Sequence, residues 1–500
     1  MRLLELITDL DGIKTSNNML AAATEIRGLT SDSREVRAGY LFAAFPGTKQ
    51  DGRLFIEEAI KKGAAAILAP EGTTVNSKTV VVLEDKNPRR SFAKMAAAYF
   101  GKQMDVIVAV TGTNGKSSTV NFCRQMWQSM EHAAACLGTI GITAPGINRA
   151  GSLTTPDPVT LHAEIAELEA SGVTHLAIEA SSQGLDQYRL DGVRITAAGF
   201  TNLTRDHLDY HSTMENYLEA KLRLFREVVI DSGVAVINSD TPYSDAIRAV
   251  CKERDLRVID YGKKAKDIRL AKQRPLSDGQ FIELIVFGER YELELPLVGD
   301  FQASNALCAL GLVLAEDPDN RLLHMQGVYA LERLQSVRGR LELAAKHPNG
   351  APIYVDYAHT PDGLETMLKA LKPHTPKNLH VIFGCGGDRD KGKRPMMGEI
   401  ATRIADKVIV TDDNPRTEDA ATIRREIMQG IIASGGKAAP KATEIAGRRD
   451  AIRTAIRHLG PDDVLVIAGK GHEQGQIVGK EILPFDDVSE ARNAVLEISK

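Results

Sequence analysis

Short apolar runs alternate with helical patterns along the chain, and this alternation predicts strands joined by helices. Within residues 1–100, three apolar runs predict strands and two amphipathic stretches predict helices. The strands are Tyr40–Phe45, Ala64–Leu68 and Thr79–Leu83, and the helices are Ile56–Lys62 and Arg90–Tyr99. The pattern predicts a small α/β unit that ends near Gly101–Met104.

A second unit opens with the buried-strand candidate Val106–Val110, which leads through Thr111–Ser118 into a helical pattern ending near Met130. Further strand candidates are His175–Ile178, Ala198–Thr201 and Val234–Ile237. Strands that alternate with helices indicate a mostly parallel sheet covered on both faces. The more polar, alternating stretch Gln280–Leu297 predicts antiparallel strands at the end of this unit.

A third unit follows Leu334. Its predicted strands are Ile353–Val355, Leu379–Phe383, Lys407–Val410 and Asp463–Ala468, and its predicted helices include Thr422–Ile432 and Arg449–His458. This pattern resembles an open Rossmann-like sheet, whose ligands bind beyond the carboxyl ends of the strands.

The length of 500 residues also favours about three domains, at roughly 150 residues each. We predict an α/β protein with a small N-terminal domain at residues 1–104, a central domain resembling a P-loop ATPase at 105–335, and a C-terminal domain at 336–500.

Charge and cysteine usage narrow the function classes. The 62 basic and 66 acidic residues leave a formal net charge of −4, which disfavours a general nucleic-acid or anionic-membrane binder. Five separated cysteines without a C-x-x-C pair disfavour a disulfide framework and a cysteine zinc site, and they suit a reducing cytoplasm. Glu5, Asp9 and Asp11 interrupt the N-terminus, and no run of about 18 apolar residues occurs, so we expect neither a signal peptide nor membrane insertion.

The segment Gly112–Ser117, GTNGKS, lies between a predicted strand and a predicted helix. Backbone N–H groups and the positive end of a helix dipole can hold phosphates at such a turn. Lys116 would offset phosphate charge, and the Ser117 hydroxyl can coordinate Mg²⁺. Because Val110 stands where a complete P-loop motif has glycine, the alternative is a glycine turn with a solvated lysine.

Glu179 and His207 follow two other predicted strands, so each could help to hold magnesium, although histidine is unusual for so hard an ion. Taken singly, each has a structural explanation as a helix cap, a surface acid or a core histidine.

Ten separated motifs together resemble the ATP-dependent Mur ligases of peptidoglycan synthesis, relatives of folylpolyglutamate synthase. The motifs are GTNGKSS (112–118), EASSQGL (179–185), TNLTRDHLDYH (Thr201–His211), Ala220-Lys221, GDFQASNALCAL (Gly299–Leu310), SVRGRLE (Ser336–Glu342), VDYAHTPD (Val355–Asp362), FGCGGDRDKGKRP (Phe383–Pro395), TDDNPRTED (Thr411–Asp419) and AGKGHE (Ala468–Glu473). They occur in the central and C-terminal predicted domains.

The resemblance implies a ligase that transfers the γ-phosphate of ATP to a carboxylate, after which an amine attacks the acyl phosphate and forms an amide. It implies Mg²⁺ as cofactor, with Ser117, Glu179 and His207 near the metal, Lys116 on phosphate and Lys221 as a carbamylated lysine. Without the resemblance, Lys221 would be interpreted as a helix-surface lysine. The ATP contacts that it implies are Gly112, Thr113, Asn114, Gly115, Lys116, Ser117, Ser118, Asn305, Arg340 and Asp356, with His359 as a weaker candidate.

Ser31–Phe42 and Pro46–Arg53 resemble the uridine-nucleotide segments of family members that add diaminopimelate. The implied contacts to UDP-N-acetylmuramoyl-L-alanyl-D-glutamate are Ser31, Ser33, Thr48, Lys49, Gln50, Thr154, Thr155, Ser181, Gln187 and Arg189. For the serines, turn or cap chemistry is an equal alternative. Gln183 replaces the usual histidine of this pattern, and Arg338 replaces a common proline.

The segment DNPR, Asp413–Arg416, matches members that add meso-2,6-diaminopimelate, whose distal carboxylate a guanidinium can bind in a bidentate way. The implied diaminopimelate contacts are Arg389, Asp413, Asn414, Pro415, Arg416, Gly469 and Glu473. Alternatives are a ligase for L-lysine, a folylpolyglutamate synthase-like ligase, and a nucleotide-binding regulatory module without catalysis. We expect a monomer whose partners are these small-molecule substrates.

Overall fold

The computed structural model describes residues 1–8, 10–47, 50–151, 153–276, 278–435 and 439–499. These residues form two compact units. The first comprises residues 1–268 and 308–327, and the second comprises residues 269–307 and 328–500.

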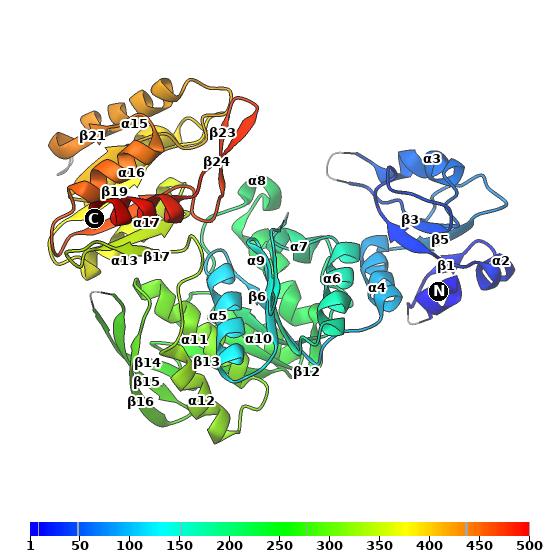
Figure 1. Cartoon of the computed structure of the whole chain (residues 1–500). Helices are drawn as coiled ribbons and strands as arrows, with labels where there is room; N and C mark the ends of the chain where they lie inside the picture. The colour runs from blue at the N-terminus through cyan, green and yellow to red at the C-terminus, as the bar shows by residue number, and fades with distance from the viewer. Residues whose placement is uncertain (9, 48–49, 152, 277, 436–438, 500) are drawn as a thin grey trace. The chain divides into compact units, whose positions relative to one another are not determined.

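The N-terminal part of the first unit contains a five-stranded sheet (Figure 1). Its order is β1 (Lys14–Thr15), β5 (Val81–Asp85), β4 (Ala66–Pro70), β3 (Tyr40–Ala43) and β2 (Gly28–Thr30), and only the pairing of β1 with β5 is antiparallel. Alternate residues of β3 enter different cores: Leu41 packs with α1 (Leu3–Ile7) and α4 (Pro88–Phe100), whereas Phe42 packs with α3 (Ile56–Lys61). The helix α2 (Asn18–Ala23) adds to the first of these cores. Helices therefore cover both faces of the sheet.

Eight strands form the central sheet of the first unit. Their order is β13 (Arg257–Gly262), β12 (Val229–Asn238), β11 (Ile195–Phe200), β6 (Val106–Thr111), β10 (His175–Glu179), β7 (Ala134–Gly138), β8 (Gly141–Ala144) and β9 (Ile147–Arg149). Neighbours from β13 to β7 are parallel, and β7, β8 and β9 are antiparallel. Because β6 lies between β11 and β10, the segments that follow these three strands meet at one edge of the sheet.

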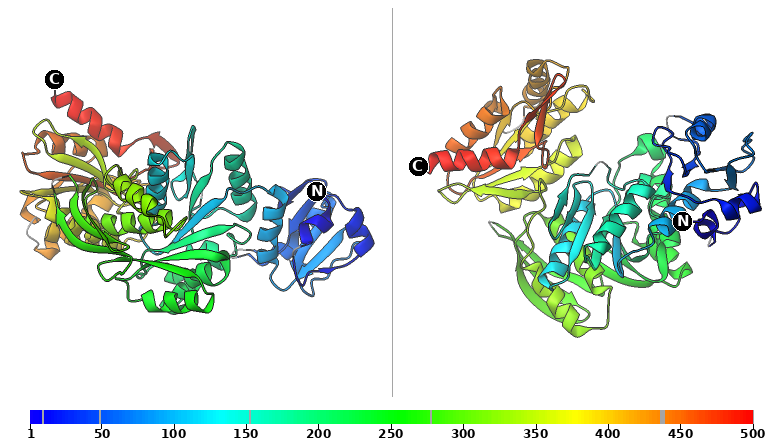
Figure 2. Two further views of the ribbon diagram at one scale, coloured as in Figure 1. Left: turned by 90° about the horizontal axis from the view of Figure 1, so that it is seen from below. Right: turned by 45° about the vertical axis from the view of Figure 1, so that its right-hand side comes forward.

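Helices pack against this sheet in Figure 2. The helices of this part of the chain are α5 (Lys116–Ser129), α6 (Pro158–Ala170), α7 (Ser182–Asp186), α8 (Leu208–His211), α9 (Met214–Arg223), the π-helical turn at Leu224–Val228, and α10 (Ser244–Glu253). Ile107 and Ala109 of β6 share a core with α6 and α9. Side-chain caps fix two of the helix starts, since Asp157 accepts from Val159 N and Thr213 accepts from Asn216 N.

In the second unit, β14 (Ile268–Pro275), β15 (Gln280–Val286) and β16 (Glu289–Leu295) are neighbours in that order. The antiparallel pairing of β15 with β16 confirms the prediction for Gln280–Leu297. The helices α11 (Asp300–Leu314) and α12 (Arg321–Leu331) follow in the chain, and their residues 308–314 and 321–327 belong to the first unit.

The C-terminal sheet has the order β17 (Glu342–Lys346), β18 (Pro352–Asp356), β22 (Val464–Ala468), β19 (Leu379–Phe383), β20 (Lys407–Val410) and β21 (Ala442–Glu444). Only β17 is antiparallel. Its helices are α13 (Pro361–Leu371), α14 (Lys393–Ile404), α15 (Ala420–Ser434), α16 (Arg448–Arg457) and α17 (Asp487–Ile498), and β23 (Gly475–Val478) with β24 (Glu481–Pro484) forms a separate hairpin. In β19, Val381 packs with α13 to α15 and Ile382 with α16 and α17, so both faces are covered.

The predicted α/β class and the mostly parallel central sheet are confirmed, and the predicted strands and helices occur with ends displaced by a few residues. For example, β11 ends at Phe200 rather than Thr201. The Thr201 hydroxyl instead donates to Asn114 O at 2.6 Å, because the chain turns there toward the phosphate loop.

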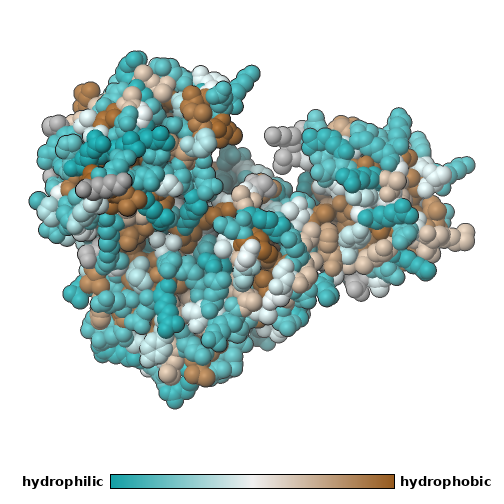
Figure 3. Space-filling view, viewed as in Figure 1, coloured by the Kyte–Doolittle hydropathy of each residue, from teal (hydrophilic) through white to brown (hydrophobic). Residues whose placement is uncertain are grey.

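The surface drawn in Figure 3 is largely hydrophilic, as expected when the apolar strand residues lie in the cores. All five cysteines are free and buried. Among the described residues, no helix is both long and apolar enough to cross a membrane.

Candidate active site

The predicted phosphate loop joins β6 to α5, and two glycines allow its shape. Gly112 has φ +146°, and a Cβ there would lie 2.0 Å from Thr201 Oγ1. Gly115 caps α5 at φ +88°, in the left-handed region. The loop therefore approaches the β11 segment more closely than a side chain would permit.

The segment after β11 holds the phosphate loop by hydrogen bonds. Asn202 accepts from Thr113 N through its backbone oxygen at 2.9 Å and from Asn114 N through Oδ1 at 3.0 Å. Thr113 Oγ1 accepts from Thr204 N at 3.0 Å and lies 3.2 Å from the Tyr217 hydroxyl. Burial raises the pKa of Tyr217 to about 12, so this phenol stays protonated and can donate. These hydrogen bonds hold the loop in one shape.

Two lysines meet at this loop. Lys116 Nζ donates to the backbone oxygens of Gly112 at 2.9 Å and Thr113 at 2.8 Å. Lys221 Nζ, from α9, also donates to Gly112 O at 2.9 Å and lies 4.5 Å from the centre of the Tyr217 ring. Lys221 is only 1% exposed, so its interpretation as a surface lysine is wrong. Burial, and secondly the charge of Lys116, lower the pKa of Lys221 well below its ordinary value.

Glu179 ends β10 and is 1% exposed. Its Oε1 accepts from Thr139 N at 2.9 Å and its Oε2 accepts from Thr139 Oγ1 at 3.1 Å. Thr139 Oγ1 also lies 3.0 Å from Thr154 Oγ1. A Cβ at Gly138 would lie 2.1 Å from Glu179 Oε1, so glycine makes room for this carboxylate.

His207 lies in the same β11 segment, at φ +51° before α8. Its side chain is about half exposed, its Nε2 is 3.6 Å from Asp206 Oδ2, and its ring meets the Tyr217 ring edge-on at 6.2 Å. The structure brings His207 to Asp206 and Tyr217 rather than into contact with Glu179.

The residues predicted near the sugar and peptide form a connected network. Thr155 Oγ1 donates to Glu179 O at 2.8 Å and accepts from Ser181 N at 3.0 Å. Arg189 donates to Thr155 O at 2.7 Å and to Gln187 Oε1 at 2.8 Å. These contacts connect four predicted residues to the Glu179 strand end.

The predicted uridine-nucleotide residues lie apart from this network. Ser31 and Ser33 follow β2, where Ser31 is exposed and Ser33 O accepts from Lys62 Nζ at 2.8 Å. Gln50 is exposed before Asp51, and Thr48 and Lys49 lie outside the described residues.

In the second unit, the predicted nucleotide residues surround the end of β18. Asp356 Oδ2 accepts from Leu341 N and its Oδ1 from Ala358 N, each at 2.8 Å, and burial raises the pKa of this carboxyl. The Arg340 guanidinium lies 4.9 Å from the centre of the Tyr357 ring. Asn305 is buried on α11 and donates to Gln302 Oε1, whereas His359 is exposed and its Nδ1 lies 2.9 Å from Tyr357 O.

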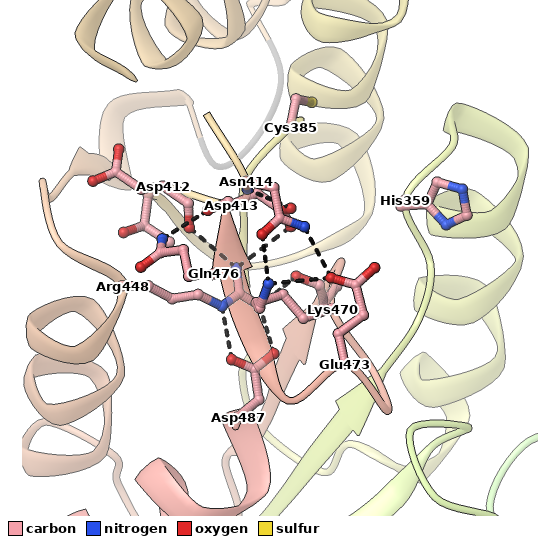
Figure 4. A network of polar contacts seen from close by, with 12 residues as sticks. His359, Cys385, Asp412, Asp413, Asn414, Arg448, Lys470, Glu473, Gln476 and Asp487 are labelled. Atoms are coloured by element: carbon pink, nitrogen blue, oxygen red, sulfur yellow. Dashed lines mark hydrogen bonds and ion pairs between the residues drawn. The ribbon is translucent and has the colours of Figure 1, made fainter. Parts of the chain in front are cut away.

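The DNPR segment follows β20, and the side chains of Asp413 and Asn414 lie in the polar network of Figure 4. Asn414 Nδ2 donates to Glu473 Oε2 at 2.9 Å, and Asn414 Oδ1 accepts from Ile477 N at 2.9 Å. Gly469 has φ +114°, and a Cβ there would lie 2.6 Å from Asp413 Oδ2. The structure therefore brings Asp413, Asn414, Gly469 and Glu473 together.

Arg416 follows the buried Pro415 and has φ +51°. Its backbone pairs with the hairpin, since Arg416 N donates to Ile477 O at 3.0 Å and its O accepts from Gly479 N at 2.7 Å. The guanidinium donates to Gly387 O at 2.9 Å, and no carboxylate of the described residues forms an ion pair with it. Arg389 is exposed near Gly386, where a Cβ would lie 2.7 Å from Arg416 Nη1.

Three domain models of one family match the chain. The Mur ligase middle domain matches residues 110–313, the glutamate ligase domain of Mur ligases matches 339–471, and the Mur ligase family catalytic domain matches 25–100. A UDP-N-acetylmuramoyl-L-alanyl-D-glutamate–2,6-diaminopimelate ligase from Zymomonas mobilis is 50% identical over 475 residues, which cover 94% of this chain and 95% of that protein. The chain belongs to the Mur ligase family.

Other members agree with this assignment. A ligase of the same name from Caulobacter vibrioides is 49% identical over 491 residues, covering 96% of this chain and 97% of that protein. A solved structure of a ligase with that name has a TM-score of 0.74 and 32% identity, covering 100% of this chain and 99% of that one. A folylpolyglutamate synthase from Mycobacterium tuberculosis, with a TM-score of 0.60 and 18% identity, shares the fold. These relatives confirm the predicted family and ligase class.

Sequence reasoning missed several residues that support the site of this Mur ligase. Lys470 is fully buried, and its Nζ donates to Asn414 Oδ1 at 2.9 Å and lies 3.2 Å from Glu473 Oε2. Arg448, also buried, forms a bidentate pair with Asp487 at 2.7 and 2.6 Å and lies 4.0 Å from Asp413 Oδ2. Lys470 stood in the motif AGKGHE, whereas no sequence signal distinguished Arg448.

His211 is a third missed residue, although it ends the motif TNLTRDHLDYH. Its Nε2 lies 2.9 Å from Ser182 Oγ, and its ring packs on Tyr217 at 5.1 Å. Burial lowers the pKa of His211. An imidazole therefore lies beside the paired serines even though Gln183 replaces the histidine that usually follows them. The other departure, Arg338, forms an ion pair with Asp486 at 2.5 Å.

Membership of the Mur ligase family implies a bound magnesium ion, and some of the side chains near the phosphate loop are suitable ligands for it. Ser117 and Glu179 offer oxygen atoms, which Mg²⁺ prefers as ligands. Proteins commonly bind Mg²⁺ through one or two carboxylates together with the phosphates of the substrate. Within the described ranges, no three His, Cys, Asp or Glu side chains form a group suited to a metal. The Lys221 amine suits the ion only after conversion to a carbamate, and the His207 imidazole is a poor match for it.

Proposed function

We propose that this Mur ligase joins an amine of meso-2,6-diaminopimelate to the γ-carboxylate of the D-glutamate in UDP-N-acetylmuramoyl-L-alanyl-D-glutamate, with ATP converted to ADP and phosphate. The observation that carries the choice of amino acid is Arg416. Its guanidinium lies in the DNPR segment, is partly exposed, and has only a neutral carbonyl as partner among the described residues. A second carboxylate on the incoming amino acid supplies the missing charge.

The phosphate loop has the task of bringing two anions together. The substrate carboxylate attacks the γ-phosphorus of ATP, the bond to ADP breaks, and an acyl phosphate forms. Lys116 and the loop amides of Gly112–Ser118 offset the negative charge of the phosphates. Mg²⁺, held by Ser117, Glu179 and His207, would neutralise further phosphate charge when bound. In the second unit we assign Asn305, Arg340, Asp356 and His359 to ATP.

Lys221 acts after carbamylation in this proposal. A neutral amine attacks CO₂, forms an N–C bond and releases a proton, which turns a cation into a carboxylate. The burial that lowers the pKa of Lys221 favours the neutral amine that this reaction needs. The negatively charged carbamate would be attracted to the Lys116 ammonium, whereas the free Lys221 ammonium is repelled by it.

The first substrate is bound by residues from two predicted domains. Ser31, Ser33 and the Thr48–Gln50 segment bind its uridine nucleotide, and Thr154, Thr155, Ser181, Gln187 and Arg189 bind its sugar and peptide. The network from Thr155 to Arg189 supports this assignment, because each side chain is held in place before substrate arrives. We retain 1–104, 105–335 and 336–500 as the domain boundaries.

Diaminopimelate binds to Arg389, Asp413–Arg416, Gly469 and Glu473. Arg416 takes the distal carboxylate and Glu473 an ammonium group. The other amine attacks the acyl phosphate, loses a proton and displaces phosphate, which leaves the amide. L-Lysine lacks the distal carboxylate and would leave Arg416 uncompensated. Because the cysteines are all free thiols, we place the reaction in a reducing cytoplasm.

Phosphate release from ATP tests the proposal. The purified chain is given UDP-N-acetylmuramoyl-L-alanyl-D-glutamate and either meso-diaminopimelate, L-lysine or no amino acid, and the product mass is measured. We expect release only with both cell-wall precursors, and a mass increase equal to diaminopimelate less water. Equal turnover with L-lysine would refute the choice of amino acid, and turnover with a folate and glutamate instead would favour the folylpolyglutamate synthase alternative.

A further inference from the structure

Two arginines of the first unit, Arg89 and Arg189, form no ion pair with a described acidic residue. Arg89 donates from Nη2 to Pro46 O at 2.5 Å, and its guanidinium lies 4.4 Å from the centre of the Phe45 ring. Arg189 donates to the oxygens of Thr155 and Gln187. Over the described part of the chain, neither guanidinium has a carboxylate within ion-pair distance. Both are half-buried.

Arg90, the neighbour of Arg89, is neutralised by ion pairs with acidic residues of the fold. Arg90 Nε lies 3.1 Å from Asp191 Oδ1, and its Nη1 lies 4.0 Å from Glu227. Asp191 also pairs with the buried Arg223 at 2.6 Å. Arg89, one residue earlier, receives no such carboxylate from the described residues.

The position of Arg89 in its helix is unfavourable for stability alone. It stands in the first turn of α4, directly after Pro88, and that turn contains no acidic residue. The positive end of the helix dipole disfavours a cation there and favours an anion. The dipole and the guanidinium therefore add to the same positive potential.

The Arg90–Asp191 ion pair brings the segments that contain Arg89 and Arg189 close together. Burial lowers the pKa of Arg89 and of Arg189, and the charge of Arg89 lowers the pKa of Arg189 further. The acidic groups that face the pair act at longer range. Asp186 and Tyr210 face Arg89, and Asp157 and Tyr210 face Arg189. Asp186 is already engaged by the Tyr210 hydroxyl at 2.7 Å. A bound anion would relieve this repulsion.

We propose that Arg89 completes, with Arg189, an anion-binding subsite for the uridine-nucleotide peptide, which extends the proposed function to a residue outside the family motifs found above. Arg89 contacts Pro46, the first residue of the predicted uridine-nucleotide segment, whereas Arg189 contacts the predicted peptide residues. The ligand chemistry is an oxyanion that accepts from two guanidiniums. In this substrate it comes either from the diphosphate or from the free α-carboxylate of D-glutamate.

The experiment compares Arg89→Met with Arg90→Met, two neighbours that remove the same charge from one helix turn. Steady-state kinetics are measured with each substrate varied in turn. For Arg89→Met we expect the KM for the nucleotide peptide to rise about 10- to 100-fold, because a charged hydrogen bond to the substrate is lost. Its KM values for ATP and diaminopimelate should stay within about twofold of the wild type. Arg90→Met should leave all three KM values within about twofold. Equal nucleotide-peptide KM values for Arg89→Met and wild type would overturn the proposal.

A second variant and a competition assay keep the result interpretable. Arg89→Lys retains the charge and should recover part of the affinity, whereas a purely structural role would show as a lower melting temperature in both Arg89 variants without a selective KM change. Competition by UDP identifies the source of the oxyanion, since weaker inhibition of Arg89→Met indicates the diphosphate and unchanged inhibition indicates the carboxylate. A wild-type chain that shows no turnover refutes the proposed function, whereas an active wild type with an unaffected Arg89→Met refutes only this subsite.

Discussion

Lys116 and Lys221 donate to the same acceptor, the carbonyl oxygen of Gly112, each at 2.9 Å. Two ammonium groups therefore share this acceptor, and Lys221 is almost fully buried. The repulsion between the two ammonium groups is removed by an incoming phosphate, by loss of the Lys221 proton or by carbamylation of Lys221. The same arrangement therefore attracts anionic ligands and prepares Lys221 to react.

Replacing Lys221 by alanine should nearly abolish turnover. The variant cannot form a carbamate, so we expect kcat to fall at least about 100-fold, the size of the loss when one charged catalytic group is removed. Phosphate release is measured with and without added bicarbonate. Bicarbonate should stimulate carbonate-depleted wild type and leave Lys221→Ala unchanged. Normal activity of the alanine variant would contradict the carbamate.

Replacing Lys221 by methionine should stabilise the ligand-free protein in bicarbonate-free buffer. The folded-state pKa of Lys221 lies below its ordinary value, so the unfolded chain binds the extra proton between the two pKa values. The free energy of unfolding contributed by this group then rises with pH across that window and is lowest below the folded pKa. At pH 7 we expect the melting temperature of Lys221→Met to exceed that of wild type by roughly 2 °C or more. The difference should shrink toward pH 10, and a lower melting temperature at pH 7 would argue against the buried, destabilising ammonium.

Arg416→Ala should raise the KM for diaminopimelate at least about tenfold, because a charged hydrogen bond to the distal carboxylate is lost. The KM for ATP should not change. Arg425→Ala, which removes an exposed arginine of α15, is the control and should behave as wild type. Kinetics with diaminopimelate varied decide the matter, and an unaltered KM in Arg416→Ala would remove the argument against L-lysine.

Lys470→Met should weaken diaminopimelate binding without a contact to that substrate. Lys470 orients Asn414 and Glu473, so its loss frees both side chains, and we expect the diaminopimelate KM to rise several-fold and stability to fall by about 1–3 kcal/mol. Lys480→Met, at the exposed hairpin turn, is the matched control. A urea titration measures stability. If Lys470 acts through Glu473, the double variant with Glu473→Gln should lose less affinity than the sum of the two single variants.

Most strands of the fold were predictable because each is a short, mainly apolar run. An example is Leu379–Phe383, in which His380 is the one polar residue and both faces are buried. The predicted strand ends were less accurate where a residue at the end of a strand binds another segment instead, as Thr201 does with Asn114 O. In the candidate site, the family resemblance named Thr155, Ser181, Gln187 and Arg189, and only the structure showed that their hydrogen bonds form one network. Arg448 could not be found, because its partner Asp487 stands 39 residues away in a segment without a motif.

The sequence by itself determined the strand and helix order, the phosphate loop after Val106–Val110, and the family resemblance, since apolar periodicity and contiguous motifs are local properties. Tertiary structure alone decided which charges are neutralised. A lysine such as Lys221 has the same side chain on a surface or in a core, and only packing removes its water and sets it beside Lys116. Likewise Arg89 and Arg90 are adjacent in sequence, yet folding places Asp191 beside Arg90 and no described carboxylate within ion-pair distance of Arg89.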